Sequence, residues 1–272
     1  MLFEFAILVS FAFVFDWLYR KVGAVIQGRF GPEFAGPFGF LQPWADFIKL
    51  LGKEEIVPRH AGTIFALVPY VVCVLPLVGI WTIMNRGNLV TIFLILALDS
   101  LLLWLVGYYS KSRFALIGSM RLVLLFFSYE LPLMLSVMAV IITTGSYNLV
   151  PVGFSLPLAF LIMFVATFAK LEFPPFDAAM AEQEIVAGYL TEYSGARLAL
   201  MRLGKKLDLV MMTYFTASLF MFNHDTTESF LLVAAISAIS NLLPRYRIDQ
   251  AVKRLWVMTP LALIQIMVVS LA

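Results

Sequence analysis

Long apolar runs are the feature that most constrains this chain. Read in windows of about 19 residues, the sequence contains eight segments that are apolar on every face, at 2–18, 64–84, 89–109, 122–143, 150–169, 209–222, 229–243 and 255–271. A bilayer-spanning helix takes roughly 20 residues, whereas strands of a membrane barrel are about 10 residues long and alternate in polarity. The sequence therefore predicts an all-α membrane protein with eight transmembrane helices.

Composition agrees with this prediction. Hydrophobic residues make up 62% of the chain and charged residues 13%, against about half and about a quarter in soluble domains. The single cysteine, Cys73, allows no internal disulfide and no cysteine-held cluster. A soluble enzyme, a secreted disulfide scaffold and a disordered chain are thereby excluded.

The positions of Lys and Arg indicate which loops face the cytoplasm. All but one of the 19 basic residues follow an odd-numbered apolar segment, and the exception is Arg86. Cytoplasmic loops carry the excess of positive charge, so we expect both termini outside and residues 1–272 to form one integral membrane domain in the plasma membrane. The expected cytoplasmic loops lie at about 19–63, 110–121, 170–208 and 244–254.

Between the first two segments, a Gly- and Pro-rich stretch at 28–39 precedes a periodic pattern. Apolar residues recur at helical spacing on one face, at Phe40, Trp44, Ile48 and Leu51, and polar residues occupy the other, at Gln42, Asp46, Lys49 and Lys53. The pattern predicts an amphipathic helix along the membrane surface. It could brace the first two spans or form the wall of a ligand entrance, and we favour the brace.

Two acids fall inside predicted spans. Asp99 lies near the middle of the third segment and Glu130 inside the fourth. An ionised carboxylate at bilayer depth costs roughly 2.5–3.5 kcal/mol on insertion scales, so each is expected to face the bundle interior, water or a partner. For Glu130 we favour a proton or ion relay over a structural hydrogen-bonded acid; for Asp99 both readings stay open.

The loop after the fifth segment alternates charged and apolar residues. Its charged members are Lys170, Glu172, Asp177, Glu182, Glu184, Glu192 and Arg197. Apolar neighbours indicate a folded segment that contacts a partner or dips toward the membrane; the alternative is a plain subunit contact without an ion path. Because no phosphate-binding glycine loop and no C-x-x-C motif is present, we expect no redox centre, bound cofactor or metal, and no nucleic acid partner.

Four stretches resemble the H subunit of respiratory complex I and its relatives in membrane-bound hydrogenases. The matching runs are QGRFGP at 27–32 with GPFGFLQPWAD at 36–46, SRFALIG at 112–118 with SYELP at 128–132, PFD at 175–177 with AEQEIVAGY and TEYSG at 181–195, and PRYRIDQ at 244–250. They occupy all four expected cytoplasmic loops in family order, so the resemblance covers nearly the whole chain.

The resemblance implies eight spans and a subunit that joins a membrane arm to a peripheral redox arm. Positions that would take part in ion coupling are Glu130, Asp177, Glu182, Glu184 and Glu192, to which the residues alone add Asp99 and Glu172. Positions that would form the redox-arm interface or a chamber wall are Gln27, Arg29, Asp46, Arg113, Arg121 and Tyr193. The implied iron–sulfur cluster, and in the hydrogenase branch a nickel–iron centre, belong to partner subunits. Further implied partners are a hydrogenase-like large subunit and antiporter-like membrane subunits.

Departures from the family pattern bear on which branch the chain belongs to. Quinone-reducing members read E-T-N-R-A-P-F-D where this sequence has Lys170 in place of the Glu and Phe173 in place of the Arg, and Met180 replaces an acid further on. A polar quinone headgroup needs donors and charge nearby. We therefore favour a ferredoxin-driven, hydrogenase-like assembly over a quinone-chamber subunit, with a docking scaffold that moves no ions as the alternative of another class. A stand-alone transporter is the least favoured.

Overall fold

The computed structural model describes residues 2–58, 62–221 and 226–271, and the backbone alone at residues 2–5, 182, 226 and 271. The described residues form ten α-helices: α1 (Leu2–Ile26), α2 (Gln42–Leu51), α3 (Thr63–Met84), α4 (Leu89–Tyr109), α5 (Arg113–Thr144), α6 (Pro157–Lys170), α7 (Glu182–Ile185), α8 (Gly195–Phe220), α9 (Thr226–Leu242) and α10 (Ile248–Leu271). Three short 3₁₀ turns join them: η1 (Pro37–Gly39), η2 (Gly153–Ser155) and η3 (Gly188–Leu190). Within the described ranges the extended backbone pairs only at one isolated bridge, between Asn88 and Asn148.

Each of the eight predicted apolar segments overlaps a helix, which confirms the all-α prediction, although residues 150–156 of the fifth segment precede α6. Helices α3, α4, α5 and α10 are long and apolar enough to cross a membrane, and α6 and α9 are shorter apolar helices. The apolar parts of α1 and α8 continue into charged stretches. Eight crossings and the sides of the two termini stay predictions. The end of the predicted sixth segment, residue 222, and positions 59–61 of the first predicted loop lie outside the described residues.

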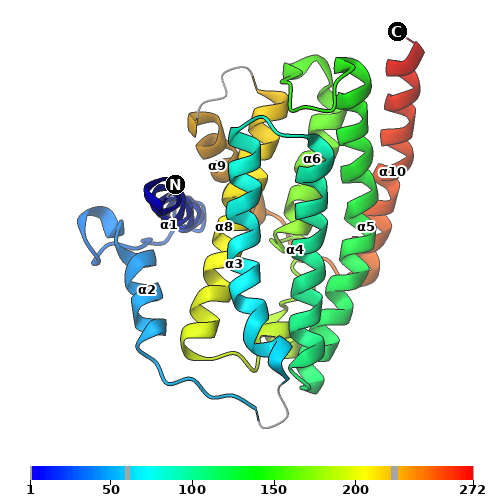
Figure 1. Ribbon diagram of the computed structural model, residues 1–272. Coiled ribbons are helices and arrows are strands. Elements are labelled where there is room, and N and C mark those ends of the chain that lie inside the picture. Colours follow the sequence, from blue (N-terminus) through cyan, green and yellow to red (C-terminus); the bar gives the residue numbers. More distant parts are fainter. Residues whose placement is uncertain (1, 59–61, 222–225, 272) are drawn as a thin grey trace.

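Helix α8 lies at the centre of the bundle. It packs against α3, α1, α9 and α6, while α5 packs against α10, α6 and α4. In Figure 1, α3, α4, α5 and α10 run up the page, whereas α1 is seen almost end-on, so α1 crosses the bundle at a steep angle.

Local chemistry explains several helix ends. The side chain of Asn88 accepts a hydrogen bond of 2.9 Å from the backbone N–H of Val90 and caps the start of α4. Gly145 ends α5 in the left-handed conformation that glycine adopts without strain. Pro157 occupies the first turn of α6, where its missing N–H costs nothing.

Helix α2 confirms the helix predicted after residue 40, but its apolar face is divided. Trp44 packs inward on Phe13, with ring centroids 4.2 Å apart. Ile48 and Leu51, by contrast, are exposed. The inner half of this face attaches α2 to α1, and the outer half is available to the membrane or to a partner.

The segment 171–194, which we call the connecting segment, folds onto one end of the bundle beside α2. We call this end of the bundle, where α2 and the connecting segment lie, the loop end (Figure 1). Gly188 has a φ of 55°, and a Cβ there would collide with the backbone oxygen of Ala179. Gly118 of α5 faces Gly188 so closely that a Cβ would approach its Cα to 2.9 Å. Both glycines let the backbone approach closely enough to bury Tyr189 completely.

Candidate functional site

A buried ion pair lies in the interior of the helix bundle. Asp99 of α4 and Lys170 of α6 have side-chain exposures of 0% and 2%, and 3.5 Å separates Lys170 Nζ from Asp99 Oδ2. The ammonium also donates to the backbone oxygen of Leu96 at 3.0 Å and to Ser100 Oγ at 2.9 Å. Lys170 therefore has three polar neighbours for its three donors, which is the condition for keeping a charge buried.

A second carboxyl completes this cluster from α8. Asp208 is 5% exposed, and the charges of Asp99 and Lys170 both act on it. Neither oxygen of Asp99 accepts a hydrogen bond from the described residues, and neither does Asp208 Oδ1. Two carboxyls beside one ammonium carry one surplus negative charge in a medium of low dielectric, so a single proton neutralises the group.

Tyr129 and Glu130 of α5 lie against the same cluster. The Tyr129 hydroxyl donates to Ser100 Oγ at 2.7 Å, and Ser100 in turn accepts from Lys170. The charge of Lys170 also acts on Glu130, whose Oε1 is buried with no hydrogen-bond partner among the described residues. Of the two predicted intramembrane acids, Asp99 therefore contacts Lys170 directly, and Glu130 lies within the reach of its charge.

Toward the loop end, Glu172 forms a second charged cluster. It is 7% exposed, accepts from the Tyr189 hydroxyl at 2.8 Å and pairs with Lys205 Nζ at 3.1 Å. Lys205 lies over the Tyr189 ring, 4.9 Å from its centroid. This places Glu172, predicted to act in ion coupling, at a partly buried ion pair between the connecting segment and α8.

A small cavity separates the two clusters. Its volume is about 10 Å³, and its lining includes Ser100, Tyr129, Lys170 and Glu172. A cavity needs about 10–15 Å³ and several polar partners to hold one water, and these side chains supply such partners. One water here would join the hydrogen-bonded groups of Glu172 to those around Asp99.

Asp177 is an acid of the connecting segment with a raised pKa. Its carboxylate pairs with Arg245, which also donates to Gln183 Oε1 at 2.5 Å. Burial raises the pKa of Asp177 more than the charge of Arg245 lowers it, so that its pKa lies at about 6. This contact joins the connecting segment to the stretch between α9 and α10.

The remaining predicted acids of the connecting segment differ in their surroundings. Glu184 pairs with Arg121 at 2.5 Å across a partly exposed surface. Glu192 is half-buried and makes no ion pair with any described residue. The side chain of Glu182 lies outside the described residues. Among the described side chains of the connecting segment, Glu172, Asp177 and Glu184 therefore each have an identified cationic partner.

A larger cavity of about 510 Å³ opens at the loop end between α1, α8 and the connecting segment. Its polar lining is formed mainly by cations and tyrosines, namely Arg20, Arg202, Lys205, Lys206, Tyr19 and Tyr193, with Asp16 as its acid. Phe173 and Met180 also line it. Lys206 and Arg20 contact Asp16 at 2.9 and 3.0 Å. A small molecule with polar groups could enter this cavity.

Two predicted wall residues lie at or beside this larger cavity. Tyr193 stacks on Phe65 with centroids 4.1 Å apart and donates to its backbone oxygen at 3.1 Å. Asp46 binds Arg20, which lines the cavity, at 2.6 Å. Burial alone would raise the pKa of Asp46, but the hydrogen bond and charge of Arg20 outweigh burial and hold the pKa below its ordinary value.

The other predicted interface residues lie elsewhere. Gln27 donates to Asn241 of α9 at 2.6 Å and accepts from Arg29 at 2.7 Å, and this group is exposed. Arg113 is exposed at the start of α5. Neither these three residues nor Arg121, the remaining predicted position, lines the larger cavity, so they could form a docking surface but no chamber wall in this chain alone.

Sequence reasoning did not single out Lys170, Lys205 or Asp208 as site residues. Lys205 and Asp208 are three positions apart, a spacing that places them on one helical face, and that signal was available. Asp208 stands one residue before the predicted sixth segment and was therefore assigned to a loop. For Lys170 nothing local reveals a buried partner, because Asp99 is 71 positions away and on another helix.

A multi-span helical membrane protein with ion-paired charges inside its bundle is the class that this fold and site define. The chain belongs to the NADH dehydrogenase family, whose model matches residues 1–270, and the family resemblance is thereby confirmed. The fold is similar to that of a chain in the structure of the membrane-bound sulfane sulfur reductase, an archaeal respiratory membrane complex. The TM-score is 0.86 and the identity 24%, over 99% of this chain and 98% of that chain.

Proposed function

We propose that this chain is the membrane-anchor and coupling subunit of a complex I-related respiratory assembly. In this assembly, electron transfer in a peripheral redox arm drives the translocation of protons or sodium ions. Membership of the NADH dehydrogenase family and the fold similarity to a chain of an archaeal respiratory membrane complex support this assignment. The chain contributes protonatable groups and docking surfaces, and the redox centres belong to its partners.

The observation that carries the proposal is the group formed by Asp99, Lys170 and Asp208. Burying charged groups costs several kcal/mol per ion even after relaxation, and apolar residues of similar volume would fill the same space at no such cost. Ionisable groups that lie together in the interior of a membrane bundle therefore indicate a functional role. Uptake and release of one proton is the chemistry that two carboxyls and one ammonium support.

The route for such a proton runs from the loop end inward. Glu172, with Tyr189 and Lys205, receives the proton near the redox arm. The small cavity between Glu172 and Ser100 holds one water that passes it on. Asp99 and Asp208 then share it beside Lys170, and Glu130 takes it onward along α5.

The partners bind at two kinds of surface. The redox arm docks at the loop end, which we place in the cytoplasm on the distribution of Lys and Arg, over the Arg121–Glu184 and Arg245–Asp177 contacts. Other membrane subunits, among them antiporter-like ones, pack along the outer face of α10, where Trp256, Val257 and Met267 are exposed.

A second candidate function, that of a quinone-chamber subunit, is favoured by the larger cavity. Its volume of about 510 Å³ lies in the range typical of small-molecule sites, and four cations line it. Yet Phe173 and Met180, which replace polar residues of quinone-reducing members, both line this cavity. The loss of polar groups at this wall supports the ferredoxin-driven, hydrogenase-like branch over the quinone branch.

Ion pumping in vesicles tests the proposal. We expect Asp99→Asn and Glu130→Gln each to lower redox-driven ion accumulation several-fold while the assembly stays intact. Asp249→Asn, at an acid that is 67% exposed, is the matched control and should pump like the wild type. If ion pumping and electron transfer were unchanged in both test variants, the proposal would be contradicted. The chain would then be a docking scaffold that moves no ions.

Composition of the purified assembly separates the two branches. The hydrogenase-like branch predicts nickel together with iron in the isolated complex and no quinone reduction. Flavin without nickel, and reduction of an added quinone that stops when the bulky variant Leu198→Trp fills the larger cavity, would favour the quinone-chamber function instead.

A further inference from the structure

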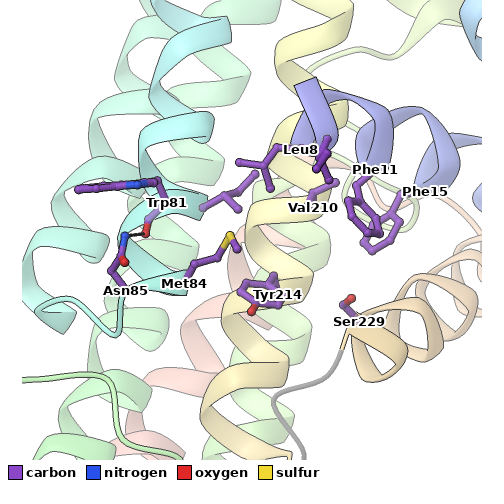
Figure 2. A pocket seen from close by; sticks show the side chains of 11 residues that line it. Leu8, Phe11, Phe15, Trp81, Met84, Asn85, Val210, Tyr214 and Ser229 are labelled. Carbon is purple, nitrogen blue, oxygen red and sulfur yellow. Dashed lines mark hydrogen bonds between the residues drawn. The ribbon is translucent and has the colours of Figure 1, made fainter. Parts of the chain in front are cut away.

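An apolar cavity lies at the end of the bundle opposite the loop end. It has a volume of about 230 Å³ and lies between α1, α3, α8 and α9. Figure 2 shows Leu8 and Phe11 of α1, Trp81 and Met84 of α3, and Val210 of α8 around the hollow. Because an apolar cavity of this kind does not hold water stably, a hydrocarbon group is the occupant that suits its lining.

The cavity is open to the surface that faces the membrane. Trp81 and Met84, which line it, are 50% and 56% exposed, and Ile7 on the other side is 40% exposed. The inner wall is closed by Phe15 and Ile80, which are almost completely buried. The opening therefore admits a group from the surrounding bilayer and leads to a closed apolar floor.

A helix of a neighbouring subunit does not fit into the cavity as a whole, so such a subunit could enter it only with single side chains. One turn of an α-helix, about 10 Å across and 5.4 Å long, occupies about 400 Å³, more than the whole cavity of about 230 Å³. The cavity would instead accommodate roughly eight methylene groups, each about as large as one water in the liquid. One hydrocarbon chain of a membrane lipid has this shape.

The rim of the cavity turns polar where α3 ends. Asn85 lines the rim and donates to the backbone oxygen of Trp81 at 2.9 Å. The next residue, Arg86, is exposed and is the one basic residue of the whole sequence that follows an even-numbered apolar segment. A lipid whose hydrocarbon chain lies in the cavity would place its headgroup at this rim, next to Arg86. An arginine side chain can bind a phosphate group in bidentate fashion.

We propose that this cavity binds one hydrocarbon chain of an anionic phospholipid whose headgroup contacts Arg86. The site lies between α1 and the α3–α8 pair, so the lipid fills the gap that the steep crossing of α1 leaves on this side of the bundle. The inference requires only that the chain lies in a membrane and does not depend on the ion-coupling role.

Photocrosslinking in proteoliposomes tests this site on the intact assembly. The probes are phosphatidylglycerol and phosphatidylcholine that carry a photoactivatable group in one acyl chain. The expected result is labelling of 7–15, 80–85 and 210–214 by the phosphatidylglycerol probe, lost in Leu8→Trp, which fills the cavity. Leu94→Trp, at an exposed position of α4, is the control and should label like the wild type.

A second variant tests the headgroup and avoids the packing change. Arg86→Gln should lower labelling by the phosphatidylglycerol probe several-fold and leave the weaker phosphatidylcholine labelling unchanged. Equal labelling by the two probes in the wild type, labelling of the same segments that persists in Leu8→Trp, or a photoreactive residue at position 8 that crosslinks to a partner subunit would each overturn the proposal.

Discussion

Lys170 Nζ lies 3.5 Å from Asp99 Oδ2, and both side chains are almost completely removed from solvent. At position 170, quinone-reducing members of the family carry a glutamate. A glutamate here would place a further carboxyl beside Asp99, whereas lysine supplies the opposite charge. The departure at residue 170 is therefore matched by an acid on a neighbouring helix, and the two positions form one unit.

This unit predicts a stability pattern that a double-mutant cycle can measure. Lys170→Met leaves Asp99 buried without its cation and should destabilise the protein by about 3–5 kcal/mol. The double variant Asp99→Asn, Lys170→Met removes both charges and should recover most of that loss. The stability of both variants is measured by thermal unfolding of the purified assembly.

The control for this cycle is Lys253→Met, at an exposed lysine of α10, which should shift the melting temperature little. Equal destabilisation by the single and the double variants would show that Lys170 and Asp99 do not act as a pair.

Asp177 predicts a pH dependence whose sign follows from its environment. Its pKa in the folded protein is about 6, above the ordinary value of about 3.9 for an unfolded chain. Between these two values the folded state binds more protons than the unfolded state, so the free energy of unfolding falls as pH rises from about 4 to about 6. In Asp177→Asn this slope should flatten.

Unfolding midpoints measured from pH 4 to pH 8 check this prediction, with Asp249→Asn as the exposed control. An unaltered slope in Asp177→Asn would assign the pH dependence to another group. A slope of opposite sign in the wild type would show that Arg245 outweighs burial in setting the pKa.

Gly188 predicts that the connecting segment tolerates no side chain at its closest approach to the bundle. Gly188→Ala forces a Cβ into a left-handed conformation, which costs roughly 1–2 kcal/mol, and into contact with the Ala179 backbone. The displaced backbone should break the hydrogen bond from Tyr189 to Glu172. We expect a lower melting temperature and easier proteolysis of the connecting segment, both measured on the assembly.

Gly62→Ala is the matched control for this substitution, because no atom lies within 4 Å of the Cβ that it would add. Equal protease resistance in Gly188→Ala and Gly62→Ala would contradict the close packing of the connecting segment.

Hydrophobic runs predicted the ends of a helix well where the sequence changes from apolar to polar residues at those ends. The segment predicted at 89–109 coincides with α4 (Leu89–Tyr109), because the polar residues Asn88 and Ser110 bound an apolar run in which Asp99 is the one charged residue. Prediction failed where helices continue through charge: α5 begins at Arg113 and α8 at Gly195, several residues before the predicted 122 and 209. Average hydropathy falls at such charged turns, although the backbone stays helical.

The same limit applies to the candidate site. Single acids such as Asp99 and Glu130 stand out because they interrupt apolar runs, and their inward location follows from the cost of burial. Their partners do not stand out, because Lys170 and Asp208 lie at the edges of runs and were assigned to a loop. Which cation meets which acid depends on how α4, α6 and α8 pack, and a sequence pattern contains no distance between helices.

The most direct measurement is a redox-induced infrared difference spectrum of the assembly in a membrane. If the protonation of the Asp99–Lys170–Asp208 group follows the redox state of the partner arm, reduction should change a carboxylic-acid C=O band. This band should be lost or shifted in Asp99→Asn and in Asp208→Asn and kept in Asp249→Asn. Identical carboxyl bands in the wild type and in all three variants would contradict the coupling role of the buried group.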